Sequence, residues 1–250
     1  MSGLTQSELT LSIEALRERG ADVDLDADGN ASFVNLFVTS IPNADLAILA
    51  GFDRLTALTL PPQFDDAGAE HLRPLAGLKK LYANDTQIGD AGVRILSGLK
   101  DLEALFLSHT KIGNAGMRSL AALEKLEILY LNGTQITDAG LDHIKEMTGL
   151  RMLVLSDTLL SNNGLRHLAG LKNLERLHLP EHISDRGLVH LQNLTTLKQL
   201  DLEDAGVTDA GLENLHALTS LEKLFLYDTK VTQPGVNSLQ LALPKCMIEL

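Results

Sequence analysis

The stretch from Leu126 to Leu141 reads Leu-Glu-Ile-Leu-Tyr-Leu-Asn-Gly-Thr-Gln-Ile-Thr-Asp-Ala-Gly-Leu, and it decides the fold because the chain repeats it. Copies in the same frame begin at Leu102 and Leu150. One apolar position of the pattern returns every 23 or 24 residues, at Leu36, Leu60, Ala83, Leu107, Leu131, Leu155, Leu179, Leu202 and Leu226. Nine copies with so regular a spacing predict one repeating structural unit and not an irregular globular core.

Each copy predicts a short strand followed by a short helix. Leu129 and Leu131 alternate with outward residues, which is the period of a strand. Thr134 is expected to bond the backbone of the next turn and to form a ladder with its equivalents. Thr137 is a favourable helix N-cap, and Asp138 places a negative charge at the start of the helix dipole. The glycine of the recurring Asp-Ala-Gly is expected to permit close backbone packing.

This pattern resembles the leucine-rich repeat family, whose segment reads L-x-x-L-x-L-x-x-N/C-x-L. Thr usually stands here where the family has Asn or Cys, and the T-D-A-G-L extension is similar to the helical-backed subtype of ribonuclease-inhibitor-like, F-box-associated and many bacterial repeat proteins. The resemblance implies an α/β fold: a right-handed solenoid shaped as a horseshoe or arc, with a parallel sheet on the concave face and short helices on the convex face. It leaves function open, because one fold hosts many functions.

The expected organisation is one single domain in three parts. Residues 1–32 form an N-terminal cap, with a capping box at Thr5 and Glu8 and the start of a hairpin. Residues 33–243 hold the repeats, and residues 244–250 form a C-terminal cap. Caps are expected because a repeat buries its apolar face only against its neighbours.

Composition argues against several classes of partner. The chain has 21 basic and 33 acidic residues and a formal net charge of −12, so neither nucleic acid nor an anionic membrane surface is an expected partner. Cys246 is the only cysteine, which suits a reducing compartment. No signal-peptide pattern or long apolar run occurs, so an acidic, cytoplasmic monomer is expected.

No phosphate-binding, hydrolase or zinc-protease motif occurs, so no catalytic residue and no cofactor is expected. Asp24, Asp26 and Asp28 resemble the opening of an EF-hand calcium loop, but Asn35 stands where the bidentate Glu belongs. A solvated hairpin turn is the preferred interpretation, and calcium binding there stays an open alternative. Four histidines share one helical position, of which the last three are in consecutive repeats, and a solvated column on the convex face is expected: His71, His143, His167 and His190.

The candidate binding residues lie at outward strand positions and at the turns that follow. Seven of the nine Phe and Tyr residues are outward: Phe33, Phe37, Tyr82, Phe106, Tyr130, Phe225 and Tyr227. Clustered exposed aromatics are typical of interaction surfaces, although aromatics also simply suit strands. The turn column is acidic at Asp85, Asp157, Glu181, Asp204 and Asp228, either to pair with a basic partner or to aid solubility. The full candidate set is Tyr82, Phe106, Tyr130, Met152, Arg176, His178, Phe225, Tyr227, Asp85, His109, Asp157, Asp204 and Asp228.

Two repeats are one residue short and place proline after the strand, at Pro61 and Pro180. Proline removes a backbone donor, so a local disturbance of the strand ladder is expected. A functional role and a tolerated deletion are equally compatible with this pattern.

The sequence therefore predicts a non-catalytic scaffold that binds a protein, with an apolar and basic surface, on the concave sheet face. The alternatives are a substrate adaptor of a ubiquitin-ligase-like complex and a small-molecule or glycan receptor. The residues before the first repeat are too few for an F-box, and a flat sheet is expected to offer no deep pocket. An enzyme or metal protein would have to use the histidine column or the Asp-rich turn.

Overall fold

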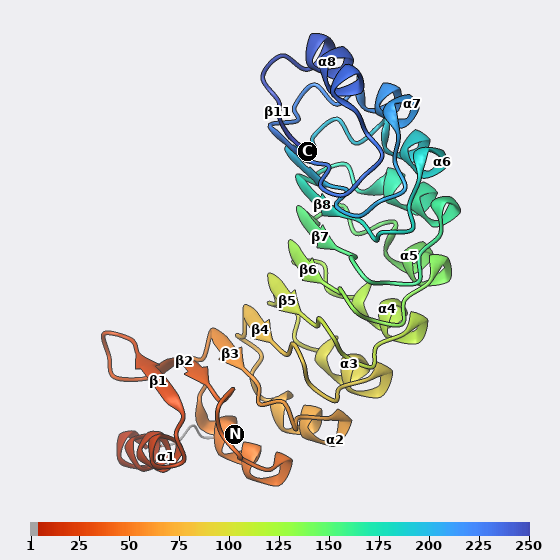
Figure 1. The fold of residues 1–250 in the computed structure, drawn as a ribbon. Helices are drawn as coiled ribbons and strands as arrows, with labels where there is room; N and C mark the ends of the chain where they lie inside the picture. The colour runs from red at the N-terminus through yellow and green to blue at the C-terminus, as the bar shows by residue number, and fades with distance from the viewer. Residues whose placement is uncertain (1–4) are drawn as a thin grey trace. The chain divides into compact units, whose positions relative to one another are not determined.

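The computed structural model describes residues 5–250, and the chain divides into two compact units between Leu126 and Glu127. In each unit the strands follow one another in chain order along one side, and the short helices lie along the other side (Figure 1). We call the strand surface that faces away from the helices the sheet face. The first four residues of the expected N-terminal cap lie outside the described residues.

The first unit contains one hairpin and a run of parallel strands. Helix α1 (Gln6–Glu18) precedes the antiparallel pair β1 (Asp22–Leu25) and β2 (Ala31–Asn35). Strands β2, β3 (Ala57–Thr59), β4 (Lys80–Tyr82) and β5 (Ala104–Phe106) are parallel neighbours. The backing elements are the 3-10 helices η1 (Asn43–Gly51) and η2 (Glu70–Leu72) and the α-helices α2 (Asp66–Ala69), α3 (Asp90–Leu96) and α4 (Asn114–Leu120).

The second unit is parallel throughout. Its strands are β6 (Ile128–Tyr130), β7 (Met152–Val154), β8 (Arg176–His178), β9 (Gln199–Asp201), β10 (Lys223–Phe225) and β11 (Met247–Glu249). They are backed by α5 (Asp138–Ile144), η3 (Asn162–Gly170), α6 (Asp185–Leu188), η4 (Val189–Leu191), α7 (Asp209–Leu212), η5 (Glu213–Leu215) and α8 (Gln233–Ala242). Each unit thus has the architecture of a leucine-rich repeat solenoid, with a backing of mixed short α and 3-10 helices.

The core is aliphatic, as the leucine content predicts. The central residue of each strand from β3 to β10 is a fully buried leucine, such as Leu81 in β4 and Leu177 in β8. Phe52 and Phe64, the two aromatic residues that do not occupy outward positions, are buried. The other seven Phe and Tyr residues lie at the outward positions that the sequence analysis assigns to them, on the sheet face or in the turns that follow the strands.

The ends of the chain bury their apolar surface in different ways. At the N-terminal end Thr5 and Glu8 form the expected capping box of α1, and that helix buries Leu9, Ile13 and Leu16. At the C-terminal end β11 pairs with β10, and Cys246 lies buried just before it. The Cys246 side chain lies in the core, and burial raises the pKa of its thiol to about 11, which lowers the share of the reactive thiolate form.

The threonines that follow the strands close their own turns. Each donates its hydroxyl hydrogen to the backbone carbonyl three residues earlier, at 2.6–2.7 Å, in Thr39, Thr86, Thr110, Thr134, Thr158 and Thr229. The expected bond to the turn is confirmed. The expected ladder is wrong for these hydroxyls, because each one uses its single donor inside its own repeat.

The aspartate of the recurring Asp-Ala-Gly acts on the next repeat and not on its own helix. The Asp90 carboxylate accepts the backbone N–H groups of Gly113 and Gly116, at 2.8 and 2.9 Å, where the following helix begins. Asp138 likewise accepts the backbone N–H and the hydroxyl of Ser161, at 2.7 and 2.6 Å. Thr137 is the N-cap residue of α5 as predicted, but its side chain does not cap that helix. Each carboxylate thus satisfies donors that a helix start leaves free.

The recurrent glycine makes room for that carboxylate. A Cβ added to Gly92 would lie 2.6 Å from Oδ1 of Asp66, and one added to Gly116 would lie 2.7 Å from Oδ1 of Asp90. The same overlap occurs with Asp138, Asp185 and Asp209 at the positions Gly164, Gly211 and Gly235. We call this pairing of one repeat's Asp with the next repeat's Gly the Asp–Gly interlock. The glycine does allow close packing, as expected, but the close neighbour is a side chain of the preceding repeat.

The interlock predicts a coupled pair of mutational effects at Asp185 and Gly211. Gly211→Ala should lower the free energy of unfolding by about 1–3 kcal/mol, because the new methyl overlaps the Asp185 carboxylate. Asp185→Ala should cost about 1 kcal/mol, because Thr208 loses the acceptor of its backbone N–H and its hydroxyl. In the double variant the overlap is gone, so the loss should be clearly smaller than the sum.

Urea unfolding followed by circular dichroism measures all three variants. Gly77→Ala is the matched control, because its added Cβ would meet nothing closer than 3.8 Å. Strictly additive losses, or an equal loss in the control, would contradict the interlock.

A second prediction concerns the thiol of Cys246. With a pKa of about 11, only about one thiol in a thousand is ionised at pH 8, and the side chain is also buried. Labelling by a thiol reagent at pH 8 should therefore follow unfolding of the C-terminal end in a urea series. Fast stoichiometric labelling of the folded protein would show that the side chain is accessible.

Candidate functional site

The first unit presents an aromatic stack on its sheet face. Tyr82 in β4 and Phe106 in β5 occupy paired positions, and their rings lie 4.5 Å apart at an interplanar angle of 12°. Both side chains are half-buried. The stack confirms that these two candidates lie together, and it holds the Tyr82 ring in a fixed orientation.

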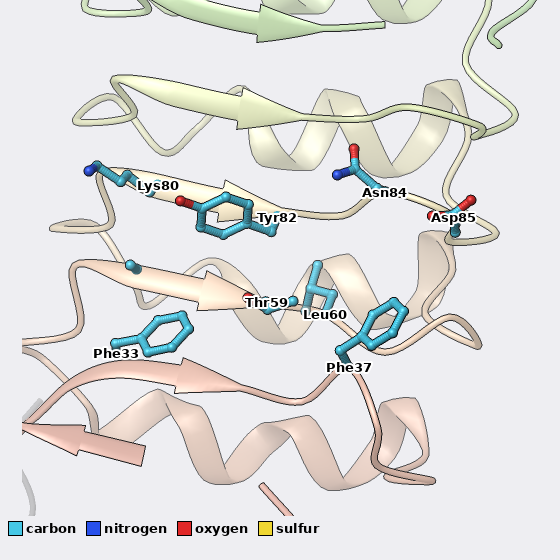
Figure 2. Close-up of a pocket in the computed structure, with 9 residues that line it drawn as sticks. Phe33, Phe37, Thr59, Leu60, Lys80, Tyr82, Asn84 and Asp85 are labelled. Atoms are coloured by element: carbon cyan, nitrogen blue, oxygen red, sulfur yellow. The ribbon is translucent and has the colours of Figure 1, made fainter. Parts of the chain in front are cut away.

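Beside this stack the sheet face is hollowed (Figure 2). The hollow has a volume of about 440 Å³ and lies over β3, between the side chains of β2 and β4. Its floor is formed by Ala57, Thr59 and the buried Leu60, and Phe33 and Tyr82 stand on either side. It exists because small side chains on β3 lie between large ones. The sheet face is therefore not flat at this place, although the sequence analysis expects a flat sheet without a deep pocket.

Charged and polar groups lie at the two ends of the hollow (Figure 2). Lys80 lies at one end, and Asp85 lies at the other end near Phe37. Both charged side chains are exposed, and neither takes part in an ion pair with another residue of the range 5–250. The adjacent Lys79 does pair, with Glu103 at 2.9 Å. Asn84 is held in place because its Oδ1 accepts the backbone N–H of Ser108.

The second unit carries the remaining aromatic candidates. Tyr130 donates its hydroxyl hydrogen to the sulfur of Met152 at 3.5 Å, across the β6–β7 pair. Phe225 and Tyr227 lie with ring centroids 6.3 Å apart, and the Tyr227 hydroxyl bonds the Glu249 carboxylate. These candidates form two local pairs at different strands of this unit.

His178 and Asp201 form an internal pair on β8 and β9. Nδ1 of His178 lies 3.0 Å from Oδ2 of Asp201. Burial raises the pKa of Asp201, but hydrogen bonds from His178 and from the Glu203 backbone outweigh it, and the pKa lies below its ordinary value. Nε2 of His178 is buried and has no hydrogen-bond partner. A bound group would reach that nitrogen only if the His178 side chain moved, so in this conformation the pair has a packing role. Arg176, the candidate at the start of the same strand, is exposed.

The turn column owes its composition to the backbone. Among residues 5–250, five non-glycine residues have a positive φ between 54° and 59°: Asp85, His109, Asp157, Asp204 and Asp228. Gly133 takes the same conformation at the equivalent place. Asp, Asn and His tolerate this region better than most residues. The left-handed backbone is therefore enough to explain why Asp is frequent in this turn column. The sequence pattern did not indicate this backbone conformation.

The two short repeats lack this left-handed residue. Strands β3 and β8 keep their full parallel pairing, so the expected disturbance of the ladder is wrong for the strands themselves. The turns differ instead, since Phe64 and Ile183 donate their backbone N–H to Pro61 and Pro180. A side chain from each short turn bonds carbonyls of the preceding repeat, namely Gln63 in one case and His182 in the other.

The metal candidates are not brought together. The Asp26 carboxylate closes its own turn by accepting the backbone N–H groups of Asp28 and Asn30, both at 2.9 Å. Within residues 5–250 no group of three or more His, Cys, Asp or Glu side chains could hold a metal ion.

The histidine column differs from the solvated column that the sequence predicts. His143, His167 and His190 are each half-buried, and Nδ1 of His167 lies 3.1 Å from Asp142. These side chains are therefore only partly open to solvent, and His167 contacts the preceding backing helix through Asp142.

Across residues 5–250 the structure has no helix that is both long and apolar enough to cross a membrane.

Comparison with known proteins supports the repeat assignment. Two family models, both described as leucine-rich repeat, match residues 76–136 and 193–215. No curated protein matches the sequence significantly.

Solved structures with a similar fold come from bacteria and a plant. An internalin (InlF) of Listeria monocytogenes is 24% identical, with a TM-score of 0.62 over 81% of this chain and 63% of its own. A leucine-rich repeat protein of Leptospira interrogans is 20% identical, with a TM-score of 0.57 over 84% of this chain and 51% of its own. The chain thus spans less than two thirds of both proteins.

The Arabidopsis receptor kinase HAESA, solved with the peptide hormone IDA and the co-receptor SERK1, is 16% identical, with a TM-score of 0.58 over 91% of this chain and 46% of its own. At these identities the likeness concerns the fold. The two family models, which together match less than half of the chain, identify leucine-rich repeats within residues 76–136 and 193–215.

Proposed function

We propose that the chain is a non-catalytic scaffold that binds a protein partner on its sheet face. The observation that carries the proposal is the Tyr82–Phe106 stack beside a hollow of about 440 Å³. Aromatic side chains packed together at the surface are frequent energetic centres of protein interfaces. Apart from Phe52 and Phe64 the apolar core is built almost wholly from aliphatic residues, so the rings of Tyr82 and Phe106 are not needed to fill it.

Charge supports a partner with basic groups around an apolar centre. The chain carries a formal net charge of −12, and exposed aspartates follow several strands, among them Asp85 and Asp204. Such a field speeds the approach of a basic partner more than it adds final affinity. Leucine-rich repeat proteins are generally protein-binding scaffolds, and HAESA, with the same fold, was solved with a peptide hormone and a co-receptor.

The remaining assignments belong to the same proposal. The chain acts as a cytoplasmic monomer without catalysis or cofactor, and its repeats belong to the helical-backed subtype. Asp138 and Asp209 of the T-D-A-G-L extension support that subtype, since they join successive backing helices.

A small-molecule receptor is the second candidate. The hollow of about 440 Å³ falls in the range of about 300–1,000 Å³ that ligand pockets occupy. It is open along one side, however, and would bury only part of a free ligand. A protein that covers the hollow while contacting its surroundings would exclude more water.

The proposal predicts that charge on the aromatic stack abolishes binding. A partner captured from lysate of the source cells would be purified, and its affinity would be measured by calorimetry. The double variant Tyr82→Glu/Phe106→Glu should weaken binding by at least about thirtyfold, which corresponds to about 2 kcal/mol.

The matched control is Arg94→Gln/Arg118→Gln on helices α3 and α4. This control makes the net charge more negative by two units, as the stack variant does, and it also changes one residue in each of two adjacent repeats. The changed residues, however, are exposed and lie on the backing helices. Both variants should give the circular dichroism spectrum of the parent. Equal affinity in the stack variant and the parent would refute the sheet face of the first unit as the binding site.

A further inference from the structure

We propose that the hollow over β3 receives one large apolar side chain of an extended partner segment, flanked two residues away by an acidic residue on one side and a basic residue on the other. The inference rests on the proposed function, because it describes the partner of the same face. It assigns Lys80 and Asp85 as the groups that select the two charges.

The walls of the hollow suit an apolar side chain. Phe33 and Tyr82 stand on either side of the small residues Ala57 and Thr59, and Phe37 lies near one end (Figure 2). Because Tyr82 is stacked on Phe106, that wall is held before any partner arrives. An inserted side chain would contact rings on two sides and Leu60 beneath, and it would displace water from apolar surface.

The width of the hollow favours an extended segment over a helix. Its walls rise from β2 and β4, which are separated by β3 alone and are therefore about 10 Å apart. A helix with its side chains is about 10–12 Å across and would rest on the wall tips. An extended chain is about 5 Å wide by the spacing of strands and can lower a side chain between the walls.

The charges at the two ends define the spacing on the partner. Lys80 and Asp85 are five residues apart along one strand and its turn, which corresponds to at most about 16 Å. In an extended segment, residues i, i+2 and i+4 point to the same side, and the outer two are about 13 Å apart. Long charged side chains bridge the small difference between these two lengths. An acidic residue of the segment then faces Lys80 and a basic residue faces Asp85, while the middle residue fills the hollow.

Two other lysines, each just before a strand, are already paired within their own unit. Lys79 pairs with Glu103 at 2.9 Å, and in the second unit Lys198 pairs with Glu175 at 2.8 Å. Lys80 and Asp85 have no such partner among residues 5–250 and remain exposed at the ends of an apolar hollow. Opposite charges at that separation read out the order of charges in a partner, which gives specificity.

The test selects peptides from a random display library on the immobilised full chain. Parent protein should enrich peptides in which an acid and a base stand four residues apart around Phe, Leu, Ile or Met, in one preferred order. The variant Lys80→Glu/Asp85→Lys keeps the net charge and the hollow, so it should enrich the same apolar residue with the order of the charges reversed. This comparison does not depend on the direction in which the peptide runs.

Affinity measurements on the best peptide, with both ends blocked, show how much each group contributes to binding. The charge-swapped variant should bind it at least tenfold more weakly, and the charge-reversed peptide should regain that loss. Thr59→Trp fills the hollow and should weaken both peptides at least tenfold, whereas Thr148→Trp, an exposed position in the second unit, should leave both unchanged.

Three results would overturn the inference: no enriched peptide, enrichment without the charge pair, or an unchanged charge order in the swapped variant. The proposed function is judged separately by the whole partner protein. If that partner is lost from Tyr82→Glu/Phe106→Glu but binds the charge-swapped variant normally, the scaffold stands and this inference fails. If neither variant affects the partner, both fail.

Discussion

A carboxylate that belongs to one repeat holds the beginning of the helix in the next, and the regularity of each unit depends on this contact. Asp66 and Asp90 each accept two backbone N–H groups of the following turn of helix. The short backing helices, often of four to seven residues, are too short to be stable by their own hydrogen bonds. Tertiary contacts of this kind, together with the buried leucines, decide where each helix starts.

The interlock also fixes the strand side of each repeat. When each helix start is tied to the one before it, the segment between them has a constant length, and the outward strand residues fall in register. That register places Tyr82 directly beside Phe106 and leaves Ala57 and Thr59 between two larger neighbours. The candidate binding face is thus a consequence of contacts on the opposite side of the repeat.

The fold could be predicted from the sequence because spacing alone carries it. Outward and inward positions followed from the alternation of leucine, and the seven aromatics at outward positions contrast with the buried Phe52 and Phe64 as expected. The interlock could not be predicted in the same way. Within one copy, Asp beside Thr looks like a local helix cap, and the true partner lies in the next copy, 23 to 26 residues later.

The candidate site was only partly predictable for a related reason. Pairing of Tyr82 with Phe106 followed from the repeat length, but the hollow depends on the relative sizes of side chains from three strands. The left-handed backbone at Asp85 and Asp204 depends on turn geometry that a pattern of polar residues does not reveal. The packing of His178 against Asp201 likewise arises between copies that differ from the consensus.

Because the Asp of every interlock belongs to one copy and the Gly to the next, the contact is indifferent to which two copies are joined. Removing or duplicating one complete period would bring a new Asp, or the Asn that takes its place in some copies, beside a new Gly, where its side-chain oxygen can accept the same backbone N–H. Gene segments of this chain can therefore recombine in frame and still encode a well-formed array. The number of repeats can therefore change in evolution, and selection can act on the sheet-face residues of each repeat separately.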